Sequence, residues 1–185
     1  ILLYTRFLAY QPERIVRIMR KVLEAKPDTH LLVVGKGLGG EEEDFLRLLQ
    51  RNELDHATTM AGWVPPHELP HYFAAADVAI YPMDDTLINR TKCSVKLIDL
   101  LAAGVPVIAD RVGQNEEYIE HNVTGLLTRP GDDEDMAEKI LALLSDEARR
   151  RALGENARRQ TRGRYSWDVL ARTAERAYQD ILSRD

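Results

Sequence analysis

Three basic side chains, those of Arg90, Lys92 and Lys96, lie close together around the start of a predicted helix. Cations at a helix N-terminus oppose the helix dipole. A bound anion would remove that conflict, because free backbone N–H groups and the basic side chains could converge on it. A solvated basic surface is the ordinary alternative. We favour a phosphate or pyrophosphate site, because the chain as a whole is acidic, with 30 Asp and Glu against 25 Lys and Arg.

The elements around these residues are those that usually hold such a site. An apolar run at 78–81 reads as a buried strand, and a polar loop follows it. A helix is expected at about 94–103, capped by Ser94 or Thr91. A second buried strand is expected at 105–109. A strand, a long polar loop, a helix and a further strand place a ligand at the carboxyl end of a parallel sheet.

Strand and helix patterns alternate along the whole chain. Strands are expected at 1–6, 31–34, 58–64, 77–82, 105–109 and 125–127. Helices are expected from Pro12 onward, at 41–52, 67–76, 94–103, 147–162 and 167–182, and around Tyr118 and Met136. In the helix at 41–52 the inward residues are expected to be Phe45, Leu46, Leu48 and Leu49. The alternation predicts a Rossmann-like three-layer α/β sandwich with a mainly parallel sheet.

Length and composition limit the class of protein. The 185 residues fit a single domain, and the formal net charge of -5 argues against nucleic acid as a partner. The lone Cys93 indicates no internal disulfide and a reducing compartment. No apolar run approaches the roughly 20 residues of a membrane span, so we expect a cytoplasmic protein, either free or loosely membrane-associated. The chain begins in a strand-like run without Met, so we expect a fragment.

The chain resembles the C-terminal, donor-binding domain of retaining glycosyltransferases of the GT-B fold, family four (glycosyl transferases group 1). The resemblance covers residues 1–185 and depends on several short motifs in the same order. They are Tyr4-Thr5-Arg6, LLVVGKG at 31–37, AGWV at 61–64, YFAAADVAIYP at 72–82, IDLLAAGVPVIA at 98–109, GQNEEY at 113–118 and Tyr165-Ser166-Trp167.

The resemblance implies roles for individual residues. Arg6 matches an arginine that binds the donor diphosphate in the family. The family's partner lysine falls near Gln11 and is therefore absent, and we expect Lys92 to replace it. Of the family's two glutamates, the second contacts the ribose and falls at Asp99, whereas the first falls at Thr91. Arg6 and Lys92 are accordingly the expected catalytic residues, and Thr91 and Asp99 lie among the expected donor-binding residues.

Other donor contacts are implied by the same resemblance. Backbone N–H groups around Ser94 and Val95 are expected to hold phosphate, and Cys93 belongs to the same turn. Val64 is expected beside the base and Gly37 near the donor. The spacing of the histidines indicates no metal site, and no cofactor is expected besides the donor substrate.

Several residues keep two interpretations. Lys96 either contacts the anion or forms a surface pair with Asp99. Asp84 and Asp85 are either turn residues or contacts for sugar hydroxyls. Trp63 packs over the nucleotide or belongs to an interface with a missing domain.

The implied activity is transfer of a sugar, with retention, from a UDP- or GDP-linked donor to an unknown acceptor. The acceptor would bind the N-terminal domain, which this chain lacks, so the isolated domain is expected to be inactive. The last helix, or the cleft rim near Trp63 and Tyr10, is expected to expose an apolar patch where that domain docks. A sugar-nucleotide epimerase of the same fold and a degenerate, non-catalytic domain are the alternatives.

Overall fold

A six-stranded parallel sheet forms the centre of the computed structural model, which describes residues 1–183. The strands follow the order β3-β2-β1-β4-β5-β6, and every pair of neighbours is parallel. This order belongs to doubly wound Rossmann-like sheets, which have a crevice where the order reverses, here between β1 and β4. The strands are β1 (Leu2–Tyr4), β2 (Leu31–Val34), β3 (Thr58–Gly62), β4 (Ala79–Tyr81), β5 (Val107–Asp110) and β6 (Leu126–Thr128).

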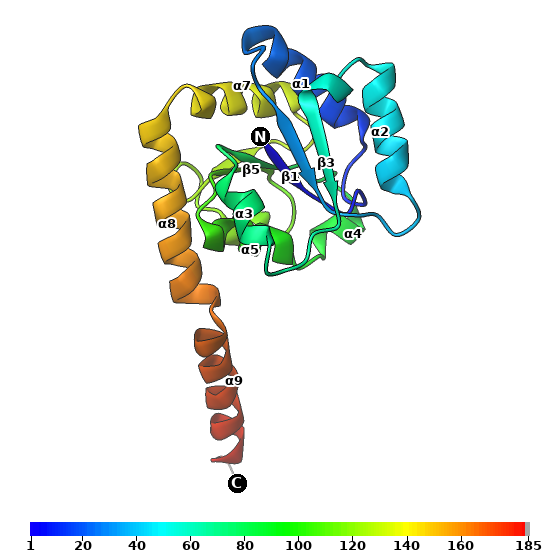
Figure 1. Cartoon of the computed structure of the whole chain (residues 1–185). Coiled ribbons are helices and arrows are strands. Elements are labelled where there is room, and N and C mark those ends of the chain that lie inside the picture. The colour runs from blue at the N-terminus through cyan, green and yellow to red at the C-terminus, as the bar shows by residue number, and fades with distance from the viewer. Residues whose placement is uncertain (184–185) are drawn as a thin grey trace.

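Helices connect the strands and cover both faces of the sheet (Figure 1). They are α1 (Glu13–Ala25), α2 (Glu41–Arg51), α3 (Leu69–Ala74), α4 (Leu87–Arg90), α5 (Val95–Ala103), α6 (Asn115–Tyr118), α7 (Asp133–Leu144), α8 (Glu147–Tyr165) and α9 (Trp167–Leu182), with a 3₁₀ turn at Asp55–Ala57. The predicted three-layer α/β sandwich is therefore confirmed, and the sheet is parallel throughout the described residues.

Two separate hydrophobic cores lie on the two faces of the sheet. Side chains from α1, α2 and α7 pack on one face, where they meet Leu3 of β1. Side chains from α3, α5 and α6 pack on the other face, where they meet Leu2. Successive strand residues point to opposite faces, so a short apolar strand such as β1 contributes side chains to both cores. Helix α8 contributes Leu153 to the first core and Ala157 to the second.

The structure differs from the predicted elements in a few places. The loop after β4 was expected to be irregular, but it contains α4, which Thr86 caps by accepting a hydrogen bond from the Asn89 N–H. Leu46 was expected to face the core, but it is exposed. The buried residues of α2 are Phe45 and Leu49. Strand β1 ends at Tyr4, so Arg6 lies in the loop that follows it.

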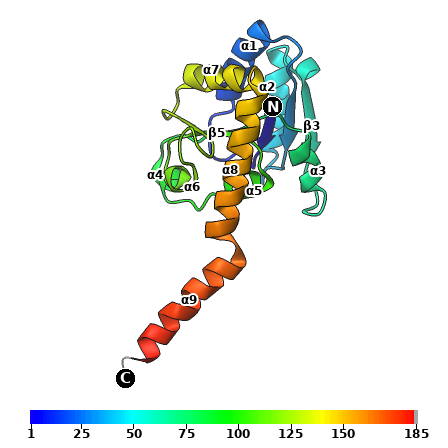
Figure 2. The same cartoon turned by 90° about the vertical axis from the view of Figure 1, so that its left-hand side faces the viewer.

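Helix α9 projects away from the sheet and its covering helices, continuing beyond the end of α8 (Figures 1 and 2). None of its residues is buried. Its large apolar side chains are exposed, namely Trp167, Leu170, Tyr178, Ile181 and Leu182. The predicted apolar patch on the last helix is thus present. Of the helices described, none is both long and apolar enough to cross a bilayer.

Candidate functional site

A cleft of about 640 Å³ opens at the carboxyl edge of the sheet, where the strand order reverses. Its walls come from segments far apart in the sequence, because parallel strands end at the same edge. They are the segment after β1 (Thr5 to Tyr10), the loop after β2 (Gly35 to Gly37), the loop after β3 (Trp63 and Val64), the segment after β4 (Pro82 and Met83) and the start of α5 (Val95 to Asp99). A cleft therefore lies at the edge of the sheet where the sequence predicts a ligand site.

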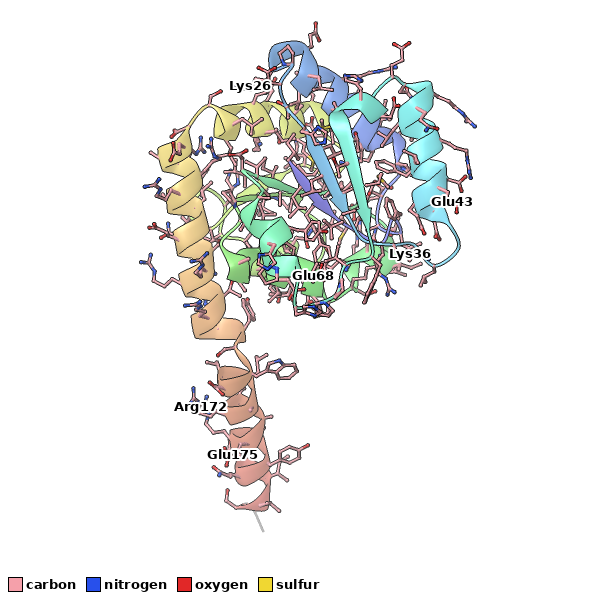
Figure 3. The ribbon with its side chains drawn as sticks, in the orientation of Figure 1. Lys26, Lys36, Glu43, Glu68, Arg172 and Glu175 are labelled. Carbon is pink, nitrogen blue, oxygen red and sulfur yellow. The ribbon has the colours of Figure 1, made fainter. Side chains whose placement is uncertain are left out.

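Basic side chains dominate the charge of this cleft. Arg6, Lys36, Lys92 and Lys96 line it, and Asp99 is the one carboxylate among its lining residues. Figure 3 shows Lys36 at this end of the domain and Lys26 at the opposite end. Four cations facing one carboxylate, in a chain with a net charge of -5, create a local positive field. The cleft is suited to a ligand that carries more than one negative charge.

Lys96 lies deeper in the cleft wall than an ordinary surface lysine. Its ammonium nitrogen is 3.8 Å from the centre of the Tyr4 ring, a cation–π contact. Burial lowers the pKa of Lys96, and the neighbouring charge of Arg6 lowers it further. Burial also raises the pKa of Asp99, while the charge of Lys96 opposes that shift.

Lys92 is held by a buried amide. Its ammonium nitrogen donates to Oδ1 of Asn89 at 2.6 Å. The Asn89 side chain in turn donates to the carbonyl oxygens of Ala9 and Asp84, each at 2.8 Å. Asn89 therefore joins the loop after β1 to the loop after β4, and it fixes the direction of Lys92. This link through Asn89 was not predicted, because Asn89 stands in a polar loop of the sequence, where such residues are common.

A buried ion-pair cluster supports the same two loops from below. Arg14 of α1 is 3% exposed. Its guanidinium binds Asp110 at the end of β5, at 2.8 and 3.2 Å, and it also binds Asp84 at 3.1 Å and Asp133 at 2.7 Å. Asp84 therefore holds the loop, through Arg14 and the Gln11 N–H, and it does not line the cleft. The available sequence signal was a lone arginine on the apolar face of α1.

The predicted contact residues divide into two groups. Gly37, Val64, Cys93 and Val95 line the cleft together with Arg6, Lys92 and Asp99. Thr91 and Ser94 do not line it. The Thr91 hydroxyl donates to the carbonyl oxygen of Leu87 at 3.1 Å, and the Ser94 hydroxyl donates to Oδ1 of Asn115 at 3.1 Å. Ser94 begins α5, but its side chain does not cap the helix.

Arg90 does not join the cationic cluster, and this part of the prediction was wrong. Helix α4 ends at Arg90, and the guanidinium binds the Asp85 carboxylate at 2.5 and 2.8 Å. Both side chains are exposed. Lys36 and Tyr4, which the sequence analysis did not select, line the cleft instead.

Glycine is required beneath the cleft. Gly35 has a φ of +133°, and a Cβ atom there would lie 1.8 Å from the carbonyl oxygen of Thr5. The turn after β2 therefore packs directly against the segment that carries Arg6. In residues 1–183, no three His, Cys, Asp or Glu side chains are grouped so that they could hold a metal ion.

Comparison with known proteins agrees with this architecture. The family described as "Glycosyl transferases group 1" matches residues 1–160. An uncharacterized glycosyltransferase of Methanocaldococcus jannaschii is 28% identical over 96% of this chain and 44% of its own length. A D-inositol 3-phosphate glycosyltransferase of Segniliparus rotundus is 30% identical over 92% of this chain and 37% of its own length. The chain thus spans less than half the length of these two relatives.

A solved structure shares the fold. HepE of Anabaena, crystallised with UDP and glucose, superposes with a TM-score of 0.75 at 21% identity, covering 100% of this chain and 48% of that one.

Proposed function

Because the chain belongs to the glycosyl transferases group 1 family, we propose that it binds a nucleoside-diphosphate sugar and forms the donor half of a glycosyltransferase. The observation that carries this proposal is the cleft at the switch point of the sheet, where four cations face one carboxylate. A diphosphate supplies the negative charges that this field favours. The similar Anabaena structure, which contains UDP, is consistent with such a ligand.

The proposed chemistry is stabilisation of a departing diphosphate. When a sugar leaves its nucleotide, negative charge develops on the diphosphate, and fixed positive groups lower the energy of that state. Arg6 and Lys92 line the cleft and would supply this charge. Because the buried amide of Asn89 fixes Lys92, that cation needs little reorganisation during the reaction. Transfer would proceed with retention, as in the family that the sequence resembles.

The remaining donor contacts are proposed from their positions in the cleft. Asp99 would accept hydrogen bonds from the ribose hydroxyls, and Val64 would lie against the base. Gly37 would lie near the donor, because it lines the cleft. Cys93 and Val95 would line the turn. The Val95 N–H, which was expected to hold phosphate, already donates to the Cys93 carbonyl oxygen at 3.0 Å, so the proposed phosphate contact in this turn is the N–H of Ser94. Thr91 faces the end of α4 through its hydroxyl, so any donor contact there would involve its backbone.

The acceptor and the rest of the protein are also matters of proposal. The exposed apolar side chains of α9, among them Trp167 and Ile181, would pack against the additional part that the relatives contain. The acceptor would enter between that part and the cleft. The proposed location is the cytoplasm, with the protein either free or loosely bound to a membrane, because nucleotide sugars would be accessible there.

A transfer assay tests this function. The assay uses a protein that contains this domain together with the additional part found in the relatives. It is incubated with UDP- and GDP-linked sugars, first without an acceptor and then with candidate acceptors. Release of nucleoside diphosphate and labelled product that depends on an acceptor is the expected result. Isomerisation of the donor sugar without an acceptor would establish the epimerase alternative. Failure to turn over any donor, with partner binding intact, would support a degenerate domain. The sequence features that favour this alternative are the absent lysine and the Thr91 that stands in place of a glutamate.

A further inference from the structure

Lys96 occupies an unusual place for a lysine in this domain. It lies in the first turn of α5 and lines the cleft, half-buried, with its ammonium above the Tyr4 ring at 3.8 Å. The ring contacts the apolar core, since Tyr4 packs against Phe73 with ring centres 5.3 Å apart. The cation–π contact therefore fixes the ammonium at the cleft wall and does not leave it free in solvent.

The surroundings of Lys96 leave its charge without a close partner. In the described part of the chain, neither Lys96 nor Arg6 forms an ion pair within 4.0 Å, whereas Arg14, Arg17 and Arg90 all do. Arg6 is close enough to disfavour the charged form of Lys96. Asp99 is the neighbouring carboxylate, and it lies three residues along the same helix. Two like charges at one cleft wall are unfavourable unless an anion lies between them.

Lys92 differs from Lys96 in this respect. The Lys92 ammonium already donates to Asn89 at 2.6 Å, which occupies one of its three hydrogen-bond positions. In the described residues the Lys96 ammonium forms no hydrogen bond or ion pair with a protein acceptor, and its contact is with the face of the Tyr4 ring. The position near Gln11, where the family's lysine would fall, also carries no cation, and the backbone N–H of Gln11 donates to Asp84 at 2.9 Å.

We infer that Lys96 binds the diphosphate of the donor directly, opposite Arg6, with the Tyr4 ring holding its ammonium in place. The inference rests on the proposed function, because it names a ligand of the same cleft. It assigns Lys96 to the ligand, where the sequence analysis left it open between an anion contact and a surface pair with Asp99. The recognised chemistry is a nucleoside diphosphate, in which two adjacent phosphates meet two cations.

Calorimetric titration with UDP, GDP and ADP tests the assignment, comparing the wild type with Lys96→Met and Lys96→Arg. Loss of one hydrogen bond to a charged group corresponds to a decrease in affinity of about 10- to 100-fold. We expect this decrease for Lys96→Met and a decrease of less than about threefold for Lys96→Arg, which keeps the charge. Arg90→Met is the matched control, because it removes a cation that lies near the cleft but pairs with Asp85 outside it.

The outcomes separate the two proposals. If the wild type binds none of the three nucleotides, the proposed function fails, and the assignment of Lys96 fails with it. If the wild type binds one of them and Lys96→Met weakens binding no more than Arg90→Met does, the donor site stands and the assignment is overturned. Urea unfolding of each variant shows that it remains folded, and we expect Lys96→Met to be no less stable than the wild type, because it removes a partly buried charge.

Discussion

Arg14 donates two hydrogen bonds to Asp110, 96 residues further along the chain, at 2.8 and 3.2 Å. Asp110 also accepts hydrogen bonds from the Met83 N–H at 2.8 Å and from the Thr128 hydroxyl at 3.1 Å. The pair therefore joins α1 to the ends of β4, β5 and β6. It supports the floor of the cleft without lining it.

Replacing Arg14 with Met is expected to destabilise the domain strongly. The change leaves Asp110 buried without a cation, and breaking a buried pair in this way costs about 3–5 kcal/mol. Arg17→Met is the matched control, because Arg17 pairs with the same Asp133 from the surface, and an exposed pair contributes at most about 1 kcal/mol. Urea unfolding measures both changes. Equal losses in the two variants would show that Arg14 acts only as a surface charge.

Two glycines of α8 are expected to respond in opposite ways to the same substitution. A Cβ atom at Gly154 would lie 2.2 Å from the carbonyl oxygen of Gly104, so Gly154→Ala must separate α8 from the end of α5. We expect a loss of about 1–3 kcal/mol. At Gly163 nothing lies within 4 Å of that position, so Gly163→Ala is expected to stabilise the helix by up to about 1 kcal/mol. Unfolding free energies that change with the same sign would contradict this account.

Asp99 is expected to make the stability depend on pH in an unusual direction. Burial raises its folded pKa above the ordinary 3.8, so between these two values the folded state binds more protons than the unfolded state. Stability from this group is therefore lost as the pH rises from 3.8 through the folded pKa. Asp99→Asn removes that loss, so its stability relative to the wild type should increase from pH 3 to pH 7, while donor affinity falls.

Asp85 provides the control of opposite sign. Its hydrogen bonds from Arg90 lower the pKa of Asp85 below 3.8, so its contribution to stability is present above 3.8 and is lost as the pH falls through the folded pKa. Asp85→Asn should thus become less stable, relative to the wild type, from pH 3 to pH 7. Thermal unfolding across this range measures both differences. The same sign for the two variants would contradict the environments described for Asp99 and Asp85.

Lys92→Met is expected to weaken nucleoside-diphosphate binding by about 10-fold or more, because it removes a charged hydrogen-bond donor from the cleft. Its ammonium is held by Asn89, so Asn89→Ala should weaken binding as well by releasing both Lys92 and the loop. Calorimetric titration measures these affinities beside Arg90→Met. An unchanged nucleotide affinity in Lys92→Met would show that Lys92 does not contact the ligand.

The fold could be predicted from the sequence because most of its elements have a strong local pattern. The apolar run of β2, the periodic apolar residues of α1 and the turn residues between them all indicate one α/β order. The error at Leu46 arose because an amphipathic pattern does not reveal how wide the buried stripe is. Helix α4 was missed because its four residues are too few to show a period.

The edge of the sheet that carries the cleft could be predicted from the sequence, but the contacts of the side chains in the cleft could not. Parallel strands bring Arg6, Lys92 and Asp99 to one edge, so their meeting in one cleft followed from the strand order. The direction of each side chain depends on tertiary contacts. Arg90 turned to Asp85 because α4 placed the two side by side, and Lys96 turned to the Tyr4 ring. The buried contacts of Arg14 join residues too distant in sequence for any local pattern to reveal.

Calorimetric titration of the 185-residue chain with UDP, GDP and ADP, repeated on Arg6→Ala, is the decisive test of nucleoside-diphosphate binding in the cleft. Arg6 lines the cleft and has no ion pair within the described residues, so its removal should affect a ligand more than the fold. We predict saturable binding of one of these nucleotides, with an affinity at least about 10-fold weaker in the variant. Binding of none of them by the folded chain, or equal binding by wild type and Arg6→Ala, would contradict the claim.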